Sequence, residues 1–193
     1  MVTMHEKRFN PEHLERLDSP ERRQALPPEK LLQSLDLKPE DTVLDLAAGT
    51  GYFAIPAAKI VDNTVYALDV QPKMLETLQS RVEQAGVKNV ELLQGPIEHI
   101  PMNGEAVNHV IASLVLHEVE PLEQGVREIH RVLKPQGTCM CLEWEKKETE
   151  QGPPLHHRIA SSDLEQVLEE NGFQIKHRSS PTSSHYLVVA QKL

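Results

Sequence analysis

Short apolar runs alternate along the chain with longer segments in which apolar residues recur at helical spacing. The runs are bounded by glycine, proline and polar residues, which favours buried strands over helices. We expect strands at residues 42–47, 64–69, 90–94, 107–113 and 138–144. The segments between and around them predict helices at residues 27–35, 52–60, 72–85, 122–133 and 161–170.

Local signals mark the ends of several of these elements. Pro72 suits the first turn of its helix, and Gly86 is expected to end that helix in the left-handed conformation. Ser161 or Ser162 is the expected N-cap of the last helix. Residues 135–137, Pro-Gln-Gly, predict a turn before the fifth strand.

Strands that alternate with helices predict an α/β fold, in which a doubly wound, mostly parallel sheet has helices on both faces. Two further strands, near residues 173–178 and 185–191, are typical of an antiparallel hairpin at the sheet edge, and they complete a seven-stranded sheet. Residues 27–193 are expected to form one domain. The charged residues 1–26 are expected to form an N-terminal cap, with a short helix near residues 11–17, that covers the site as a lid.

Composition narrows the classes of function. The net charge is −9 and no basic run is present, so nucleic acid is not an expected partner. No segment approaches the roughly 20 apolar residues of a membrane span, and the polar N-terminus lacks the core of a signal peptide, so we expect a cytoplasmic protein. Cys139 and Cys141 lie two apart in one strand, and we expect small buried thiols there rather than a disulfide or a metal site.

Residues 43–51, Val-Leu-Asp-Leu-Ala-Ala-Gly-Thr-Gly, lead from a buried strand into a turn of small residues. Residues with little or no side chain let backbone N–H groups approach a bound ligand closely. A helix follows the turn, and the N-terminus of a helix favours negative charge. The pattern predicts a ligand at the end of the first strand, although tight packing between a strand and a helix produces the same pattern.

Polar or turn-forming residues also follow the next three strands. Asp69 ends the second strand, about 18 residues beyond the glycines, where a carboxylate can accept the hydrogen bonds of a ribose diol. Residues 95–98, Gly-Pro-Ile-Glu, follow the third strand, and residues 113–118 follow the fourth. Because ligands of parallel sheets bind beyond the carboxyl ends of the strands, these residues together predict a nucleoside site. Taken singly, Asp69 also suits a helix cap and His117 a structural histidine.

In the order and spacing of these features, residues 27–193 resemble the class I S-adenosylmethionine-dependent methyltransferases. That family has an acidic residue and alternate glycines after its first strand, an acidic residue ending its second, and a sheet closed by an antiparallel last strand. Residues 120–137, which end Arg-Val-Leu-Lys-Pro-Gln-Gly, are similar to its small-molecule branch, which includes quinone-biosynthesis and arsenite methyltransferases. The resemblance implies a Rossmann-like fold, S-adenosylmethionine as the cofactor and a small-molecule substrate, and it leaves the oligomeric state open.

The resemblance also implies a role for each residue of the cofactor site. Asp45 would orient the turn and the amino end of the cofactor, while the backbone of residues 47–51 would line the methionine moiety. Asp69 would hold the ribose hydroxyls, Val70 and Ile97 would contact the adenine, and Ser113 would flank the sulfonium. The expected cofactor-binding residues are Asp45, Ala47, Ala48, Gly49, Gly51, Asp69, Val70, Ile97, Glu98 and Ser113.

Two positions depart from the family pattern. Ala47 replaces the first glycine, and it is expected to fit there only with a negative φ angle. Pro96 replaces a common acidic residue and cannot pair with the adenine amino group, which leaves open whether Glu98 takes over that contact.

The implied reaction is in-line transfer of the sulfonium methyl group to a nucleophilic atom of a small molecule. His117 is the candidate general base and Glu118 its candidate orienting carboxylate, because both follow the fourth strand beside the expected methyl group. Glu143 and Trp144 end the fifth strand and are candidates for a substrate pocket, although Trp144 is equally consistent with core packing. No metal is expected.

Two other functions remain open on the sequence. One is a non-catalytic member of the fold that binds the cofactor or a partner. The other is an NAD-dependent oxidoreductase, against which Asp45 argues because a pyrophosphate would meet its like charge.

Overall fold

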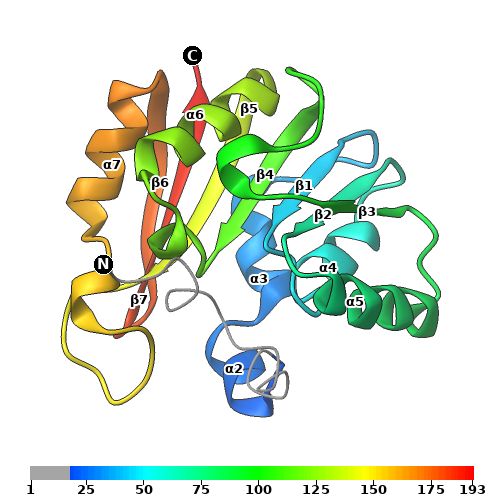
Figure 1. Ribbon diagram of the computed structural model, residues 1–193, viewed down its shortest axis with the longest axis horizontal. Coiled ribbons are helices and arrows are strands. Elements are labelled where there is room, and N and C mark those ends of the chain that lie inside the picture. The colour runs from blue at the N-terminus through cyan, green and yellow to red at the C-terminus, as the bar shows by residue number, and fades with distance from the viewer. Residues whose placement is uncertain (1–17) are drawn as a thin grey trace.

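Seven strands form one sheet in the computed structural model, which describes residues 18–193 (Figure 1). Their order across the sheet is β3-β2-β1-β4-β5-β7-β6. β1 to β5 are parallel neighbours, whereas β7 is antiparallel to both β5 and β6. The strands are β1 (Val43–Leu46), β2 (Val65–Asp69), β3 (Val90–Gln94), β4 (Val107–Ser113), β5 (Leu133–Trp144), β6 (Phe173–Thr182) and β7 (His185–Lys192). The predicted doubly wound sheet and its C-terminal edge hairpin are confirmed.

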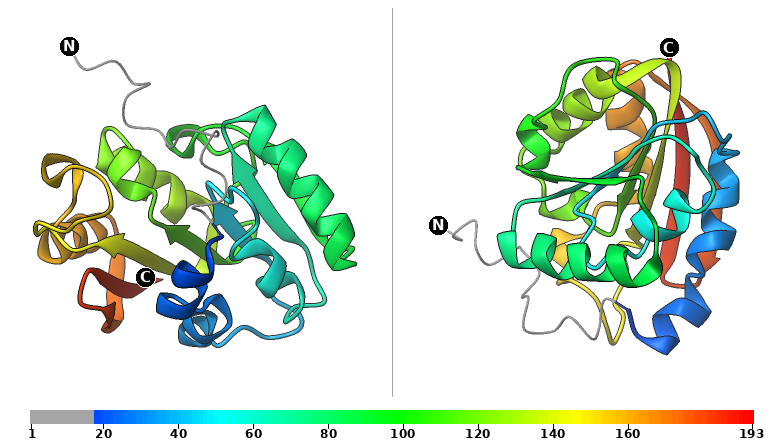
Figure 2. Two further views of the ribbon diagram at one scale, coloured as in Figure 1. Left: turned by 90° about the horizontal axis from the view of Figure 1, so that it is seen from below. Right: turned by 90° about the vertical axis from the view of Figure 1, so that its right-hand side faces the viewer.

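Helices cover both faces of this sheet, and each face has its own aliphatic core. Figure 2, in its edge-on view, shows α3 and α6 on opposite sides of the sheet. α3, α4 and α5 pack on one face, and α6 and α7 pack on the other. The α-helices are α2 (Pro20–Ala25), α3 (Pro28–Leu32), α4 (Ala54–Ala58), α5 (Pro72–Ala85), α6 (Leu122–Val132) and α7 (Ser161–Glu170). The 3-10 turns are η2 (Gln33–Leu35), η3 (Ile97–His99), η4 (Leu116–Glu118) and η5 (Leu155–His157).

Several predicted boundaries differ from the structure for local reasons. β6 extends to Thr182 rather than ending near residue 178, and the predicted helix at residues 27–35 is α3 followed by the 3-10 turn η2. α4 is shorter than residues 52–60, because the turn after β1 continues to its first residue. The predicted turn at residues 135–137 lies inside β5 as an irregularity, where the pairing with β4 jumps from Leu133 to Thr138. The expected serine N-cap of α7 is wrong: the cap position is Ala160, and no side chain bonds the first turn.

The two cysteines are free and fully buried in the core between β5 and α6, as expected. Their side chains point to the same face of β5, and the two Sγ atoms are 3.4 Å apart. The hydrogen bond with the Cys139 thiol, together with burial, raises the pKa of the Cys141 thiol well above its usual range. These residues therefore act as small apolar groups of the core.

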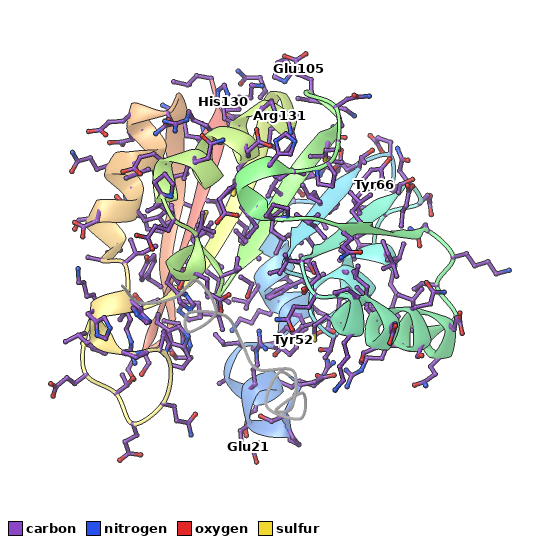
Figure 3. The ribbon with its side chains drawn as sticks, in the orientation of Figure 1. Glu21, Tyr52, Tyr66, Glu105, His130 and Arg131 are labelled. Atoms are coloured by element: carbon purple, nitrogen blue, oxygen red, sulfur yellow. The ribbon has the colours of Figure 1, made fainter. Side chains whose placement is uncertain are left out.

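The described part of the predicted N-terminal cap consists of residues 18–26. α2 lies here, and the Tyr52 hydroxyl donates a hydrogen bond of 2.8 Å to the carbonyl oxygen of Leu26 (Figure 3). The Arg22 guanidinium stacks on the Tyr52 ring, 4.1 Å from its centre. The predicted helix near residues 11–17 lies outside the described residues, and the lid role of the cap stays a prediction.

The turn after β1 takes the left-handed backbone conformation at alternate residues. Ala47 has a φ of 49°, Gly49 of 54° and Gly51 of 83°. The expectation of a negative φ at Ala47 is wrong, because the fold imposes on this alanine the conformation that glycine takes without strain. The family pattern is thus kept in the backbone although one glycine is missing.

We predict that Ala47→Gly stabilises the protein. Removal of the methyl group relieves the left-handed strain, which is worth about 1 kcal/mol in the free energy of unfolding. Ala48→Gly is the matched control, because Ala48 is buried and lacks a positive φ, so that substitution is expected to destabilise. Urea denaturation measures both. Equal destabilisation by the two substitutions would contradict strain at Ala47.

Candidate functional site

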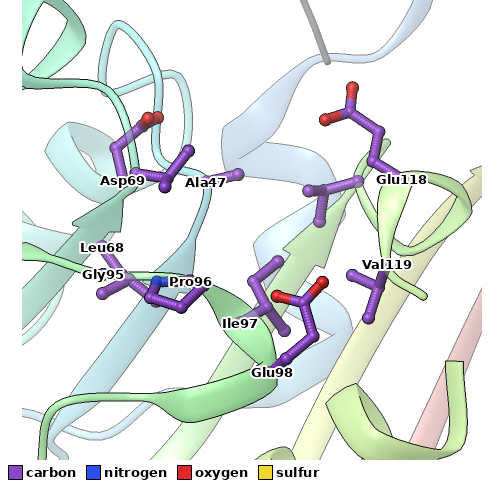
Figure 4. Close-up of a pocket in the computed structure, with 11 residues that line it drawn as sticks. Ala47, Leu68, Asp69, Gly95, Pro96, Ile97, Glu98, Glu118 and Val119 are labelled. Carbon is purple, nitrogen blue, oxygen red and sulfur yellow. The ribbon is translucent and has the colours of Figure 1, made fainter. Parts of the chain in front are cut away.

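An open pocket lies beyond the carboxyl ends of β1 to β4, and its space of about 410 Å³ is continuous with solvent. Its walls come from the turn after β1, the end of β2, the segment after β3 and the segment around η4 (Figure 4). The lining residues are Ala47, Leu68, Asp69, Val70, Gly95, Pro96, Ile97, Glu98, Val115, Glu118 and Val119.

Asp69 stands at one wall of the pocket and is held by the backbone. Its Oδ2 accepts a hydrogen bond of 3.1 Å from the Gly49 amide, and its Oδ1 accepts one of 2.9 Å from the Gln71 amide. The carboxylate is therefore fixed in orientation between the turn after β1 and the start of α5. A carboxylate held at this position can accept hydrogen bonds from a pair of neighbouring hydroxyl groups.

Asp45 lies deeper, at the end of β1, and is 2% exposed. The Ala54 amide donates a hydrogen bond to this carboxyl group, and Oδ2 is buried without any hydrogen-bond partner. Burial, together with the nearby Asp69 charge, raises the pKa of Asp45 to about 8, despite the Ala54 amide and the Arg22 charge. A buried carboxyl oxygen without a partner is costly and usually marks a functional position.

The wall formed by the β3–β4 connection is fixed by polar side chains of α6. The Glu128 carboxylate accepts a hydrogen bond of 2.8 Å from the Ile100 amide. Arg131, labelled in Figure 3, pairs with Glu128 at 2.7 Å and donates to the carbonyl oxygens of Ile100 and Met102 at 2.9 and 2.7 Å. Gln124 donates to the carbonyl oxygen of Glu98. Sequence reasoning missed these residues, because charged residues three apart on a helix also suit a solvated surface pair.

The adenine side predicted for residues 95–98 forms part of this wall. Pro96, Ile97 and Glu98 all line the pocket, and Figure 4 shows the Glu98 carboxylate beside Ile97. Glu98 is thus placed where it could take over the contact that Pro96 cannot make.

The histidine after β4 is oriented by a glutamate from the next strand. His117 Nδ1 lies 2.9 Å from Glu143 Oε2, and the His117 and Glu143 side chains are 8% and 0% exposed. Burial lowers the pKa of His117, but the Glu143 charge, its hydrogen bond and the Glu118 charge outweigh this effect and raise it overall. Glu143 contacts the ring of His117, whereas Glu118, the predicted orienting carboxylate, lines the pocket opposite Asp69 (Figure 4), and its role stays a prediction.

The predicted site residues divide into a lining and a supporting layer. Those that line the pocket are Ala47, Asp69, Val70, Ile97, Glu98 and Glu118. Asp45, Ala48, Gly49, Gly51, Ser113 and His117 lie outside that lining. Ser113 Oγ at the end of β4 is buried without a hydrogen-bond partner, as is Asp45 Oδ2. The structure therefore brings the predicted residues together at one end of the sheet, and their ligand contacts remain predictions.

Comparison with known proteins identifies the family. Residues 44–141, about half of the chain, match the family model described as "Methyltransferase domain". The chain belongs to this methyltransferase family. No helix among residues 18–193 is long and apolar enough to span a membrane.

Relatives of known function in this family are methyltransferases. Demethylmenaquinone methyltransferase of Chlorobaculum tepidum is 34% identical over 114 residues, which are 59% of this chain and 45% of that protein. Arsenite methyltransferase of Halobacterium salinarum is 34% identical over 103 residues, which are 52% of this chain and 26% of that protein. The alignments thus span half or less of these relatives.

Solved structures share the fold of this chain over most of its length. A SAM-dependent methyltransferase from Aquifex aeolicus superposes with a TM-score of 0.90 and 29% identity, over 96% of this chain and 100% of that one. The [4+2]-cyclase SpnF superposes with a TM-score of 0.78 and 18% identity, over 87% and 81% of the two chains. The first agrees with the predicted family, and the second shows the fold alone.

S-adenosylmethionine is the cofactor of this family, and the site fits it. An ammonium group would give Asp45 Oδ2 the partner that it lacks. Asp69 stands where a ribose would bind, in a pocket that continues to the apolar Ile97 and Val119. Within residues 18–193, no group of three or more histidine, cysteine or acidic side chains is arranged to hold a metal ion.

We predict that Asp45→Asn stabilises the unliganded protein increasingly as the pH rises. Because the pKa of Asp45 is about 8 in the folded state and 3.8 ordinarily, the folded protein holds a proton that the unfolded chain releases. Wild-type stability therefore falls between about pH 4 and 8, by up to about 1.4 kcal/mol per pH unit, and asparagine removes this loss.

Denaturation of both proteins at pH 5 and pH 8 measures this difference. Asp36→Asn is the control, because the Asp36 side chain is 84% exposed and its neutralisation should change little with pH. A stability difference between Asp45→Asn and wild type that stays constant from pH 5 to 8 would show that Asp45 is ionised throughout.

Proposed function

We propose that the protein transfers a methyl group from S-adenosylmethionine to a small-molecule acceptor by in-line displacement. The observation that carries this proposal is the fixed Asp69 carboxylate at the wall of an open pocket, in a chain of this methyltransferase family. When bound, the cofactor supplies a methyl group already activated by positive sulfur. The protein's task is then to hold donor and acceptor in line and to exclude water, which can supply roughly 7–11 kcal/mol of the barrier.

The acceptor that we propose is an organic molecule rather than arsenite. Both classes occur among the relatives, as the names demethylmenaquinone methyltransferase and arsenite methyltransferase state. Arsenic chemistry would favour thiols at the site, whereas Cys139 and Cys141 are fully buried in the core and do not line the pocket. An organic acceptor needs no thiol.

We propose His117 as the general base for an acceptor that must lose a proton. Glu143 fixes the ring through Nδ1, which leaves Nε2 as the atom that would take the acceptor proton. His117 belongs to the segment after β4 that borders the pocket, because its neighbours Val115, Glu118 and Val119 line it. A base of this kind contributes about 10²–10⁴-fold in rate.

A non-catalytic role and an oxidoreductase remain the alternatives. The fold alone does not decide between functions, as the superposition with a [4+2]-cyclase illustrates. An NAD pyrophosphate would lie close to Asp45, and above about pH 8, where this carboxyl group is ionised, its like charge argues against the oxidoreductase.

We predict that turnover rises with pH above the ordinary histidine range, because the raised pKa of His117 must be exceeded before the ring can accept a proton. Formation of S-adenosylhomocysteine across a panel of phenols, hydroquinones and amines finds an acceptor, and its rate is then measured from pH 5.5 to 9. His117→Ala is expected to remove the pH-dependent rise and to lower the rate about 100-fold or more.

Glu143→Gln is the matched control for this profile. Glutamine keeps a hydrogen-bond acceptor near His117 Nδ1 but removes the charge. The increase of turnover with pH should therefore occur at lower pH, and the rate at high pH should fall less than in His117→Ala. Unchanged turnover at every pH in His117→Ala would show that His117 is not the base. No methyl transfer to any acceptor would contradict the proposed function.

A further inference from the structure

His185 is a buried side chain for which the reaction outlined above has no role. It begins β7 and pairs with Trp144, the last residue of β5. The residue is 8% exposed, and its ring packs on the Trp144 indole with 4.1 Å between ring centres. Nδ1 lies 2.7 Å from the Thr182 hydroxyl, whereas Nε2 is buried without any hydrogen-bond partner. The ring is therefore held in place with one polar atom left over, which requires an explanation.

The position of His185 in the sheet connects it to the cofactor site. β7 runs antiparallel to β5, so its first residue lies at the same end of the sheet as the last residues of the parallel strands. The register places His185 on the same face of the sheet as Asp45 and Ser113. Asp69, Asp45 and Ser113 belong to β2, β1 and β4, which are consecutive strands, and β5 and β7 follow β4.

The order of the strands separates the space for the cofactor from the space for the methyl acceptor. If the cofactor extends from Asp69 past Asp45 to Ser113, the next places along the same edge belong to β5 and β7. His185 then lies two strand spacings beyond Ser113, about 10 Å across the sheet, and two residues, about 7 Å, further along the strand direction. Both Ser113 Oγ and His185 Nε2 are buried without a partner, so this side of the edge carries hydrogen-bonding capacity that the protein itself does not use.

The charges around His185 indicate the chemistry of its partner. Burial and the nearby Arg22 and Arg158 guanidinium groups lower the pKa of His185 to about 4, against the opposing effect of Glu143. The ring is thus neutral at pH 7. Thr182 accepts a hydrogen bond from the Ser184 amide, and in the tautomer in which its hydroxyl donates to Nδ1 the His185 proton lies on Nε2. A donor N–H beside two cations suits an anionic or strongly accepting oxygen.

We propose that His185 is a specificity-determining residue of the acceptor site, where Nε2 donates a hydrogen bond to a carboxylate or phenolic oxygen of the methyl acceptor. The inference rests on the proposed function, because it takes the ligand beyond Ser113 to be the acceptor. It assigns His185 to acceptor binding and not to proton transfer.

Two substitutions separate the two nitrogen atoms of the ring. In His185→Asn the side-chain amide replaces Nδ1 and keeps the contact with Thr182, but nothing replaces Nε2. In His185→Gln the longer amide reaches the position of Nε2. The asparagine variant should therefore lose the acceptor contact, and the glutamine variant should retain it.

Binding is measured by NMR on histidine-labelled protein saturated with S-adenosylhomocysteine. The probe is 4-hydroxybenzoate, which carries both oxygen types, and p-xylene is the control ring without oxygen. We expect His185→Asn to bind 4-hydroxybenzoate about tenfold more weakly than wild type, as loss of one hydrogen bond predicts, and His185→Gln to bind within about twofold. Both variants should retain wild-type affinity for S-adenosylhomocysteine.

Equal binding of 4-hydroxybenzoate by wild type and His185→Asn would overturn the assignment. Two results with the wild-type protein would do the same: binding of p-xylene as tight as that of 4-hydroxybenzoate, or binding of neither compound. Failure of wild-type protein to bind S-adenosylhomocysteine is a different result, because it would overturn the proposed function itself.

Discussion

The hydrogen bond from the Gly49 amide to the Asp69 carboxylate joins the two strand ends on which the rest of the site depends. It links the turn after β1 to the end of β2, so the shape of the turn and the direction of the carboxylate are fixed together. The turn can present its amide this way because residues 47, 49 and 51 all take the left-handed conformation. The pocket wall and the start of α4 follow from this arrangement.

Several features of the site lower the stability of the folded protein and make no contact that stabilises the fold. Asp45 Oδ2, Ser113 Oγ and His185 Nε2 are buried without partners, and Ala47 is strained. By contrast, Arg158 donates to the carbonyl oxygens of Pro153, Glu145, Lys147 and Gln151 and to the Thr149 hydroxyl. Unsatisfied groups that gather along one edge of a sheet are best explained by ligands that complete them.

Much of the fold could be predicted because local signals and tertiary packing agree. α5 begins at Pro72 and ends at Ala85, with Gly86 as its left-handed C-cap, as its sequence requires. β4 has its buried apolar residues, Val107 and Val110 to Ala112, between two covered faces. The positive φ of Ala47 was not predictable from its side chain, since the turn between β1 and α4 imposes it. The partner of His117 depends on β5 lying next to β4, which places Glu143 and not the adjacent Glu118 against the ring. The bonds from α6 to the β3–β4 connection likewise depend on which face of the helix meets that segment.

The central claim is that the turn after β1 and Asp69 form a site for the adenosyl and amino-acid parts of S-adenosylmethionine. Calorimetric titration of the whole chain with S-adenosylmethionine, S-adenosylhomocysteine and NAD tests it most directly. The structure predicts saturable one-to-one binding of both adenosyl amino acids, because Asp45 has an unused oxygen for an ammonium group. It predicts no binding of NAD above about pH 8, where the ionised Asp45 carboxylate repels a pyrophosphate. Binding of NAD without binding of either adenosyl amino acid would contradict this account.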